Sequence, residues 1–352
     1  MTPALPSVLR APTPARLPVD VESAAAFIAA VQKPNGEIPW SIGGKTDPWD
    51  HVESAMGLDV AGNRAGARRA YDWSLQNQLS DGSWWSEYRE GRPAQDAYKD
   101  PNMTAYIAVG VLHHFLICRD RAFLSRMWDC VQGAMNFVIG LQRPEGQIPW
   151  ALRADGSLSA RALLTGSSSI YMSLRCAEDI ASALGEKRPG WREARLRLGE
   201  AIRLRPHLFD STKARFSMDW YYPVLCSAVT GKEAQRRIAT SWRRFAVPGW
   251  GVRCVSDRPW ATMAETAELA LTLAAIGRYD AAETVMSWLA DKKYADGAFW
   301  TGVTFPEGVI YTTEKTAWTV AAVLLAADSL YGLTPASGLF RHEPARELVP
   351  IG

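Results

Sequence analysis

Acidic side chains recur where a polar loop meets an apolar, helix-forming stretch of the chain. The set is Asp47, Asp50, Glu53, Asp100, Asp219, Glu265, Glu268 and Glu314. Asp47 and Asp100 each precede a proline, a pattern typical of a helix N-cap followed by proline at the first helical position. Capping is therefore one explanation for these two residues, and contact with a substrate at the helix start is the other.

Four of the acids call for a chemical explanation: Asp50, Glu53, Glu265 and Glu314 are expected on the first turns of otherwise apolar helices. A carboxylate on a first turn gains from the helix dipole, but a buried one needs a partner or a task. Paired carboxyl groups, one protonated and one ionised, perform the general acid–base hydrolysis of glycosidic bonds. These acids therefore indicate hydrolysis of a glycosidic bond as the candidate chemistry.

Tryptophan is the second unusual feature, with fifteen residues in a chain of 352. Those in or beside long loops are Trp40, Trp49, Trp84, Trp85, Trp150, Trp220, Trp250, Trp260 and Trp300. Flat aromatic faces stack on the C–H faces of sugars, and they also stabilise the carbocations of polyprenyl chemistry. Trp40, Trp84, Trp150 and Trp300 have a second explanation, because they recur in a repeat and would do so if they only held the fold together.

Further candidate substrate-binding residues lie next to these acids and aromatic residues. They are Asp47, His51, Tyr88, Asp100, Asp219 and Tyr221, in addition to Glu53, Glu314 and the tryptophans of the loops. His51 is included because it directly follows Asp50.

The remaining histidines and the cysteines suggest no metal site. His113 and His114 lie in an apolar stretch and are predicted to be core residues, whereas His207 and His342 are predicted at the surface. The five cysteines are scattered without a C-x-x-C pair, which favours reduced thiols and a cytoplasmic protein. The sequence also has no Gly-rich phosphate loop, no G-x-S-x-G and no H-E-x-x-H motif. We therefore predict neither a metal nor a cofactor.

A repeated segment shows how the candidate residues are positioned. An amphipathic helix end, then Gln or Lys, a Gly turn and an aromatic residue occur four times, in segments that end at Trp40, Trp84, Trp150 and Trp300. A loop and a more uniformly apolar helical stretch follow each copy. With two less similar copies, the apolar stretches start near 50, 102, 167, 219, 262 and 314, a period of about 50 residues.

The two kinds of helix differ in polarity. The amphipathic helices are predicted at 21–32, 64–78, 121–142, 191–205, 232–245 and 279–292, with apolar residues at i, i+3, i+4 and i+7. The second kind is apolar nearly all round, as a helix buried on both sides should be. Six alternations of an outer and an inner helix predict an all-α fold, an (α/α)6 toroid of six helical hairpins. No stretch shows the apolar–polar alternation of a β-strand over enough residues to favour a different fold.

The toroid predicts the domain organisation and the place of the site. A single domain at 19–335 follows a Pro-rich arm at 1–18 and precedes a surface tail at 336–352. Every loop from an outer to an inner helix opens on one mouth, and these loops are long, as functional loops often are.

The first and fifth inner helices face each other across the funnel, which predicts Asp50 and Glu265 as the catalytic pair. A wide separation between the two carboxyls would admit a water molecule and favour inversion. The sequence leaves open which of the two is the acid. Glu53 and Glu314 would tune pKa values or bind sugar hydroxyls.

Composition excludes several classes of protein. Lys and Arg number 39 against 37 Asp and Glu, a net charge of +2 that gives no reason to expect a nucleic acid or an acidic membrane as partner. An apolar fraction of 47% indicates a folded core. No run of eighteen apolar residues and no secretory signal is present, so we predict no membrane association. An oligo- or polysaccharide is the predicted partner.

The Q-x-x-x-G-x-x-W segments resemble the repeats of squalene-hopene cyclases and of protein prenyltransferase β subunits. The D-x-D-D acid motif of the cyclases is absent, however, and no Asp/Cys/His set matches the zinc site of the transferases. This resemblance implies a toroidal fold. A terpenoid cyclase or prenyltransferase-like protein remains the alternative function.

A second resemblance rests on longer segments. FVIGLQRPEGQIPWA and DPNMTAYIAVGVLHHFL resemble six-hairpin glycosidases. More narrowly, DPWDHVESAMGL, GSSSIYMSLRCA and MDWYYPVL resemble the mycobacterial hydrolases of methylmannose polysaccharide, over most of residues 20–335. This resemblance implies a cytoplasmic, inverting, endo-acting α-mannosidase that cuts α-1,4-linked mannose chains. Composition and spacing alone do not distinguish mannose from glucose, and a sugar-binding scaffold without activity is a further possibility.

Overall fold

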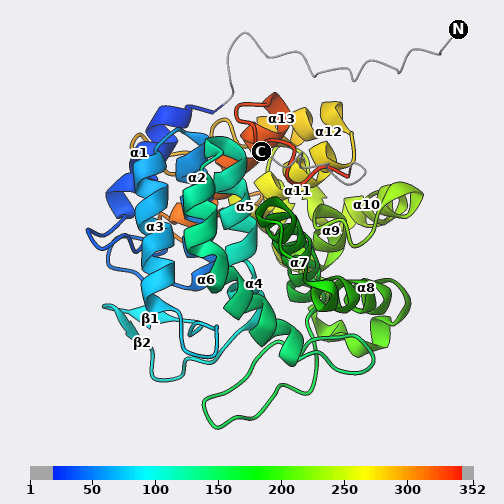
Figure 1. Ribbon diagram of the computed structural model, residues 1–352. Helices are drawn as coiled ribbons and strands as arrows, with labels where there is room; N and C mark the ends of the chain where they lie inside the picture. Colours follow the sequence, from blue (N-terminus) through cyan, green and yellow to red (C-terminus); the bar gives the residue numbers. More distant parts are fainter. Residues whose placement is uncertain (1–18, 343–352) are drawn as a thin grey trace, which may run out of the picture.

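The computed structural model describes residues 19–342, so the predicted arm and most of the predicted tail lie outside the described residues. Helices alternate between an outer and an inner ring (Figure 1). The outer helices are α1 (Val21–Val31), α3 (Arg64–Asn77), α6 (Arg121–Gly140), α8 (Pro189–Leu204), α10 (Gly231–Phe245) and α12 (Tyr279–Ser287). The inner helices are α2 (Pro48–Val60), α4 (Pro101–Ala105) with α5 (Ile107–Cys118), α7 (Leu164–Leu184), α9 (Ser217–Leu225), α11 (Met263–Ala275) and α13 (Ala317–Tyr331).

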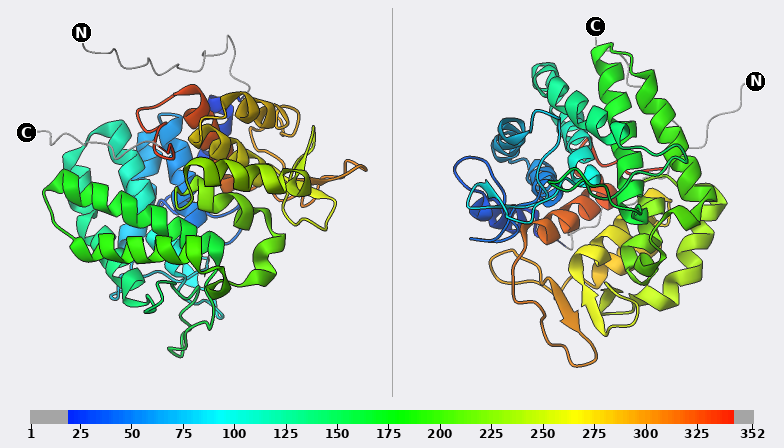
Figure 2. Two further views of the ribbon diagram at one scale, coloured as in Figure 1. Left: turned by 90° about the vertical axis from the view of Figure 1, so that its right-hand side faces the viewer. Right: turned by 90° about the horizontal axis from the view of Figure 1, so that it is seen from below.

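The inner helices form a closed ring. Each packs against the next, in the order α2, α5, α7, α9, α11 and α13, and α13 packs against α2 again. In the right-hand view of Figure 2 the colours accordingly run around the molecule from blue through green and yellow to orange. The predicted (α/α)6 toroid is confirmed.

The sequence repeat has a structural explanation in the outer ring. The side-chain amide of Gln78 donates two hydrogen bonds. One goes to the backbone carbonyl of Gly82 in its own turn at 2.9 Å, and the other to the backbone carbonyl of Cys130 on the next outer helix at 2.8 Å. Gln32 and Gln142 make the equivalent pairs of hydrogen bonds. The Gln and Gly of the repeat therefore join consecutive hairpins.

The fourth copy of the repeat closes this outer ring. Its glycine, Gly297, has a φ of 88° and lies so close to α1 that a Cβ atom there would be 2.1 Å from the Ser23 carbonyl oxygen. Only glycine fits such an approach in this backbone conformation. The last hairpin is thereby held against the first.

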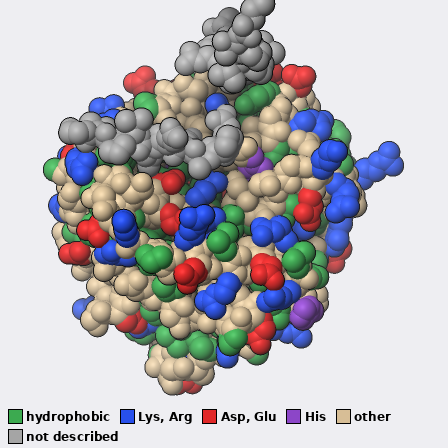
Figure 3. Space-filling model, turned by 45° about the vertical axis from the view of Figure 1, so that its right-hand side comes forward, with side chains coloured by type: hydrophobic (Ala, Val, Ile, Leu, Met, Phe, Trp, Pro, Cys, Tyr) green, Lys and Arg blue, Asp and Glu red, His purple; other side chains and the backbone are tan. Residues whose placement is uncertain are grey.

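Polarity separates the two rings as predicted. Every residue of α11 is buried, and α13 is buried except for Trp318 and Tyr331. By length and composition the segment Pro101–Cys118 could cross a membrane, but 89% of it is buried inside the protein, as expected of a core helix. On the face shown in Figure 3, Lys and Arg side chains lie among Asp and Glu side chains and form no continuous basic surface there.

Short strands occur in the loops, and no pattern in the sequence had predicted them. The strands β3 (Ala246–Val247), β4 (Gly251–Arg253), β5 (Trp260–Thr262) and β6 (Gly302–Thr304) pair antiparallel in that order, and β1 (Tyr88–Arg89) pairs with β2 (Arg92–Pro93). Two or three residues are too few to show the alternation of a strand. The four-stranded sheet joins the fifth long loop to the sixth. Two 3₁₀ turns, Pro206–Leu208 and Ser211–Arg215, precede α9.

The described part of the predicted tail does not lie on the surface. Leu339 and Phe340 are buried, and the Leu339 carbonyl accepts a hydrogen bond from Arg175 at 3.1 Å. His342, predicted at the surface, is partly buried and its ring contacts the Val224 carbonyl at 2.5 Å. The surface prediction is therefore wrong for Leu339 and Phe340, which are buried, and for His342, which contacts the end of α9.

Candidate active site

Asp47 is the N-cap of α2 and has both of its carboxylate oxygens occupied. Oδ1 accepts the backbone N–H of Asp50 at 2.9 Å, and Oδ2 accepts the indole N–H of Trp40 at 2.6 Å. Pro48 occupies the first helical position, as the sequence predicted. The capping explanation of Asp47 is confirmed, and Trp40 holds this carboxylate in place.

Asp50 lies in an environment that favours the protonated form of its carboxyl. Burial raises its pKa well above the usual range, and the negative charges of Asp47 and Glu53 raise it further. A hydrogen bond between the carboxyls of Asp47 and Asp50 also raises the pKa of Asp50, while it lowers that of Asp47. In this pair Asp50 therefore carries the proton.

Glu53 and Glu268 meet deeper in the funnel, one on α2 and the other on α11. Glu268 accepts hydrogen bonds from the hydroxyls of Tyr221 and Tyr222, the latter at 2.6 Å. Burial nevertheless raises the pKa of Glu268 to about 7. Burial, followed by the charge of Glu268, raises the pKa of Glu53 well above its usual range.

Glu265 lies on the first turn of α11, one turn before Glu268 on the same face of the helix. It is buried, and its Oε2 atom has no hydrogen-bond partner. The carboxylate also accepts a hydrogen bond from the Cys254 thiol, and this contact, after burial, helps to raise the pKa of Cys254. A buried carboxylate oxygen without a partner is available to a substrate or to a water molecule.

Trp49 connects these carboxylates to a cavity. Its ring lies 5.7 Å from that of Tyr106 and 5.8 Å from that of Tyr222, between ring centroids. On its other side Trp49 lines a cavity of about 260 Å³, together with Asp100, Trp150 and Asp219. Trp49, Trp150, Asp100 and Asp219 were all predicted to contact substrate, and the structure brings them together.

Asp100 and Asp219 are both anchored at this cavity. Asp100 caps α4 by accepting the backbone N–H of Asn102 at 2.8 Å, and burial raises its pKa to about 7. Asp219, on the first turn of α9, accepts the hydroxyl of Thr165 at 2.7 Å, and burial raises its pKa as well. Asp100 is thus a cap, as its proline predicted, and also a wall of the cavity.

The other loop tryptophans form a partly buried rim. They are Trp85, Trp250, Trp260 and Trp300. Trp260 donates its indole N–H to the Tyr311 carbonyl at 2.6 Å, and the two rings meet edge to face. Tyr311 is 58% exposed. This pair therefore presents aromatic surface at the edge of the small sheet.

Some predicted site residues serve the fold. Trp84 is buried and donates to the Ser74 carbonyl at 2.9 Å. Trp220 is buried and stacks on Phe245 with 5.2 Å between ring centroids. Tyr88 is buried against Trp73. These side chains are engaged in packing, which is the second explanation that the sequence offered for Trp84.

His51 is also engaged within the protein. It is fully buried, its Nδ1 accepts the Ile38 N–H at 3.0 Å, and its Nε2 lies 2.9 Å from the Ala70 carbonyl. Burial lowers the pKa of His51 to about 4. Because Asp50 and His51 are consecutive on a helix, they point in different directions, and His51 points into the first hairpin.

Glu314 does not lie on the first turn of a helix, so that expectation is wrong. The helix α13 begins at Ala317, and Glu314 is an exposed loop residue. Its Oε1 accepts the hydroxyl of Ser41 in the first long loop at 2.7 Å. Glu314 therefore connects the last and the first loops of the mouth.

Sequence reasoning placed Glu268 at the mouth but assigned it no role, and it missed Tyr106 and Tyr222. The spacing of Glu265 and Glu268 by three residues was a usable signal, since it puts both on one helix face. No local pattern showed that Tyr222 would contact Glu268, because the two lie on different helices.

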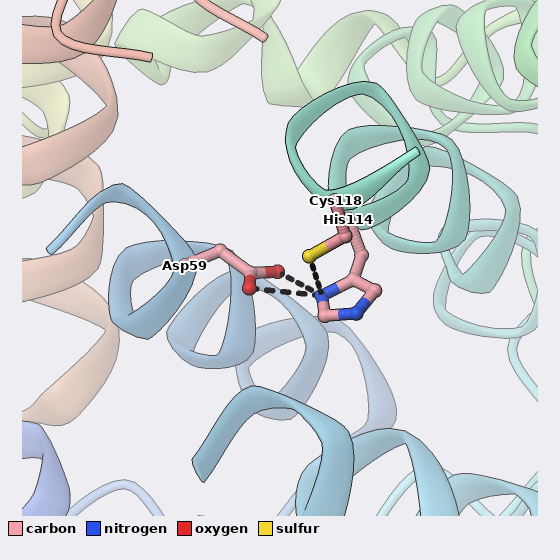
Figure 4. A group of neighbouring side chains, drawn as sticks. All are labelled: Asp59, His114 and Cys118. Carbon is pink, nitrogen blue, oxygen red and sulfur yellow. Dashed lines mark hydrogen bonds and ion pairs between the residues drawn. The ribbon is translucent and has the colours of Figure 1, made fainter. Parts of the chain in front are cut away.

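A separate cluster of polar side chains, Asp59, His114 and Cys118, lies at the C-terminal ends of α2 and α5, away from the mouth (Figure 4). His114 Nδ1 is 2.8 and 2.9 Å from the two oxygens of Asp59, and the Cys118 sulfur is 4.0 Å from the same nitrogen. By residue type this group could hold a metal ion. Asp59 and Cys118 approach the same nitrogen, so the histidine cannot relay a proton between them. We interpret the group as a buried link between two helices, with His113 and His114 in the core as predicted.

The fold and the mouth together define an (α/α)6 toroid with an acidic, aromatic-lined funnel. Solved structures with this fold include a glycosidase variant in complex with glucose, with a TM-score of 0.68 and 17% identity over 89% of this chain and 96% of that one. A mannosylglycerate hydrolase from Thermus thermophilus has a TM-score of 0.67 and 11% identity over 86% and 98% of the chains. A D-mannose isomerase has a TM-score of 0.69 and 10% identity over 89% and 96%. The fold alone therefore does not decide the reaction.

Sequence similarity decides the family. The chain is 48% identical over 324 residues to the MMP endo-(1,4)-3-O-methyl-α-D-mannosidase of Mycolicibacterium hassiacum, covering 92% of this chain and 89% of that protein. This chain belongs to the family of that enzyme. No family model matches the chain. The resemblance to the mycobacterial polysaccharide hydrolases is thus confirmed, and nothing in the comparisons supports the terpenoid cyclase alternative.

Proposed function

We propose that this protein hydrolyses α-1,4 bonds within methylmannose polysaccharide or its mannan precursors, in the cytoplasm. The support is its membership of a family whose named relative is an endo-acting mannosidase, with similarity along nearly the whole chain. All five cysteines are free thiols, which suits a reducing compartment.

The pairing of Asp50 with Asp47 is the observation that carries the mechanism. The mechanism needs a proton donor for the leaving oxygen, and Asp50 is held protonated by burial and by the neighbouring charges of Asp47 and Glu53. When Asp50 gives up its proton, the bond between the sugar carbon and the bridging oxygen breaks. Asp47 and Glu53 therefore act on pKa rather than on the substrate.

Glu265 is proposed as the general base. Its partner-free Oε2 takes a proton from a water molecule as that water attacks the anomeric carbon from the face opposite the leaving oxygen. The product then has inverted configuration. Glu268, which accepts the hydroxyls of Tyr221 and Tyr222, lies one helical turn further along α11 on the same face as Glu265.

The substrate chain is proposed to cross the mouth between the cavity and the rim. Trp49, Trp150, Asp100 and Asp219 would bind the sugar units inside the cavity. A longer stretch of chain would contact the rim, together with two further residues of the mouth, Trp40 and Glu314. An endo-acting enzyme needs such contacts on both sides of the bond that it cuts.

Hydrolysis of α-1,4-mannooligosaccharides, with and without 3-O-methyl groups, tests the proposal. Asp50→Asn and Glu265→Gln should each lower kcat by about 100-fold to 10,000-fold. The matched surface substitutions Asp129→Asn and Glu200→Gln should leave kcat unchanged, since both residues are exposed on outer helices. Hydrolysis that survives both active-site substitutions would exclude this pair, and turnover of prenyl diphosphates alone would exclude the glycosidase function.

A further inference from the structure

The cluster of Asp59, His114 and Cys118 links α2 to α5, but a hydrogen-bonded link needs only two of its three side chains. The Nδ1 atom of His114 carries at most one hydrogen, and the two oxygens of Asp59 already lie 2.8 and 2.9 Å from it. The Cys118 sulfur approaches the same nitrogen at 4.0 Å (Figure 4). An oxygen, a nitrogen and a sulfur therefore lie around one point.

The separations of these donor atoms are close to those of a tetrahedral metal site. All three atoms lie within 4.8 Å of one another. Zinc binds nitrogen and oxygen at about 2.0 Å and sulfur at about 2.3 Å, which in a tetrahedron puts nitrogen about 3.3 Å from oxygen and about 3.5 Å from sulfur. The His114 nitrogen is 2.8 Å from Asp59 Oδ1 and 4.0 Å from the Cys118 sulfur, so each distance differs by about 0.5 Å from the tetrahedral value. Small side-chain rotations would admit the ion.

Helix geometry holds the three side chains together. His114 and Cys118 are four residues apart on α5 and share one face of it, while Asp59 comes from the neighbouring inner helix α2. Asp59 and His114 are buried, whereas Cys118 is partly exposed. An ion would therefore enter from the solvent side of Cys118.

His113 gives a second, independent observation beside the cluster. It is 1% exposed, and neither of its ring nitrogens has a hydrogen-bond partner among the described residues. Its Nδ1 lies 4.0 Å from Asp59 Oδ2. Burial lowers the pKa of His113 to about 3, so the ring stays neutral and does not repel a cation. Buried polar atoms are nearly always paired, and a water molecule bound to a metal ion would give this imidazole its partner.

The charges around the cluster are compatible with a divalent ion. Burial raises the pKa values of Asp59 and of the Cys118 thiol, while the positive charges of Arg64 and Arg68 lower both. An ionised carboxylate and a thiolate together carry two negative charges, which a divalent cation neutralises. The two arginines would then lie beside a group with no net charge.

We propose that Asp59, His114 and Cys118 bind one zinc ion, which joins the C-terminal ends of α2 and α5. The ion takes the place of the hydrogen between Asp59 and His114 and of the thiol hydrogen of Cys118, and a water molecule fills the fourth position. Mixed oxygen, nitrogen and sulfur donors suit zinc, whereas Ca²⁺ and Mg²⁺ prefer oxygen alone. The site does not depend on the proposed function, because it lies at the helix ends away from the mouth.

Cobalt(II), a spectroscopic substitute for zinc, tests the sulfur ligand directly. The full chain is stripped with EDTA and titrated with Co²⁺, and the near-ultraviolet absorption from thiolate-to-cobalt charge transfer is recorded. One equivalent of Co²⁺ should saturate this band, and Zn²⁺ should abolish it by displacing the cobalt. Because Zn²⁺ would bind the folded state, it should also raise the melting temperature, and EDTA should reverse the rise.

Two substitutions distinguish a metal site from a hydrogen-bonded link. Losing a group that only orients a metal ligand costs about 10-fold to 100-fold in affinity, so Cys118→Ser should weaken Zn²⁺ binding at least about 100-fold and abolish the cobalt band. Asp59→Asn keeps an oxygen that accepts a hydrogen bond from His114, and so preserves the link, but it should weaken Zn²⁺ binding as well. Cys254→Ser, at the other partly exposed cysteine, should change neither.

The contrary results are equally specific. A wild-type protein without a cobalt–thiolate band overturns the site, and so does a band that Cys118→Ser leaves intact or that Cys254→Ser removes. Equal stabilisation of the wild type and Asp59→Asn by Zn²⁺ would show that Asp59 is not a ligand, which also overturns the site. Each of these results leaves the cluster as a hydrogen-bonded link, whether or not the protein hydrolyses mannan.

Discussion

Replacing Glu268 with glutamine should flatten the dependence of the protein's stability on pH. Glu268 is 7% exposed, and its pKa is about 7 in the folded protein. In the unfolded chain a glutamate loses its proton near its ordinary pKa, which is 4.5. Between these two values the folded state holds a proton that the unfolded state has lost, so the free energy of unfolding falls as the pH rises.

The size of the effect follows from the two pKa values. The difference is 7 − 4.5 = 2.5, and each pKa unit corresponds to about 1.36 kcal/mol, so Glu268 lowers the free energy of unfolding by about 3 kcal/mol between pH 4.5 and pH 7. Above pH 7 its contribution no longer changes. Glutamine cannot ionise, so any hydrogen-bond energy that it loses with Tyr221 and Tyr222 is the same at every pH.

Urea unfolding at several pH values between 4.5 and 8.5 measures this difference. The free energy of unfolding of Glu268→Gln minus that of the wild type should rise by about 3 kcal/mol across the range and level off above pH 7. Glu283→Gln, at an exposed position on α12, should give a difference that does not vary with pH. A parallel pair of curves for Glu268→Gln and the wild type would refute the idea that a protonated carboxyl is buried at the bottom of the funnel.

Three other substitutions test separate parts of the site. Asp47→Asn keeps the helix cap but removes the charge that raises the pKa of Asp50, so the high-pH limb of the kcat/KM profile should move down by about one to two pH units. Asp20→Asn, at the N-cap of α1, should not move that limb. Trp220→Ala should lower the free energy of unfolding by about 3–5 kcal/mol in urea melts, because the ring is buried against Phe245. His51→Gln should lower it by about 1–3 kcal/mol while KM for oligosaccharides stays constant, since both ring nitrogens are used inside the protein.

The fold could be predicted from the sequence because its signals are local and repeated six times. The glutamines of three copies, Gln32, Gln78 and Gln142, each donate to a backbone carbonyl of the next hairpin. The short strands and the packing of Leu339 could not be predicted. They depend on contacts between segments far apart in the chain, and those segments have no periodicity of their own.

The site was predictable as a region, and less so as a set of side chains. Asp50 and Glu265 lie on the first turns of α2 and α11, as the sequence predicted, and their catalytic roles stay a prediction. The direction of each side chain was harder to predict. His51 follows Asp50 on the helix yet points into the first hairpin, and Glu314 lies three residues before the helix that it was expected to begin. Successive residues of a helix point in different directions, so a shift of one position moves a side chain out of the site. An error in the predicted start of a helix has the same effect.

The burial that keeps Asp50 protonated also lowers the free energy of unfolding of the protein at neutral pH. A general acid must keep its proton near the working pH, which requires a carboxyl whose pKa is raised. In the folded state Asp50, Glu53 and Glu268 all have raised pKa values, chiefly because they are buried. By the linkage that applies to Glu268, each of them makes the folded state less stable at neutral pH than at acid pH. Neutral amides at these positions should therefore stabilise the protein at neutral pH, and the loss of activity would show why the carboxyls are present.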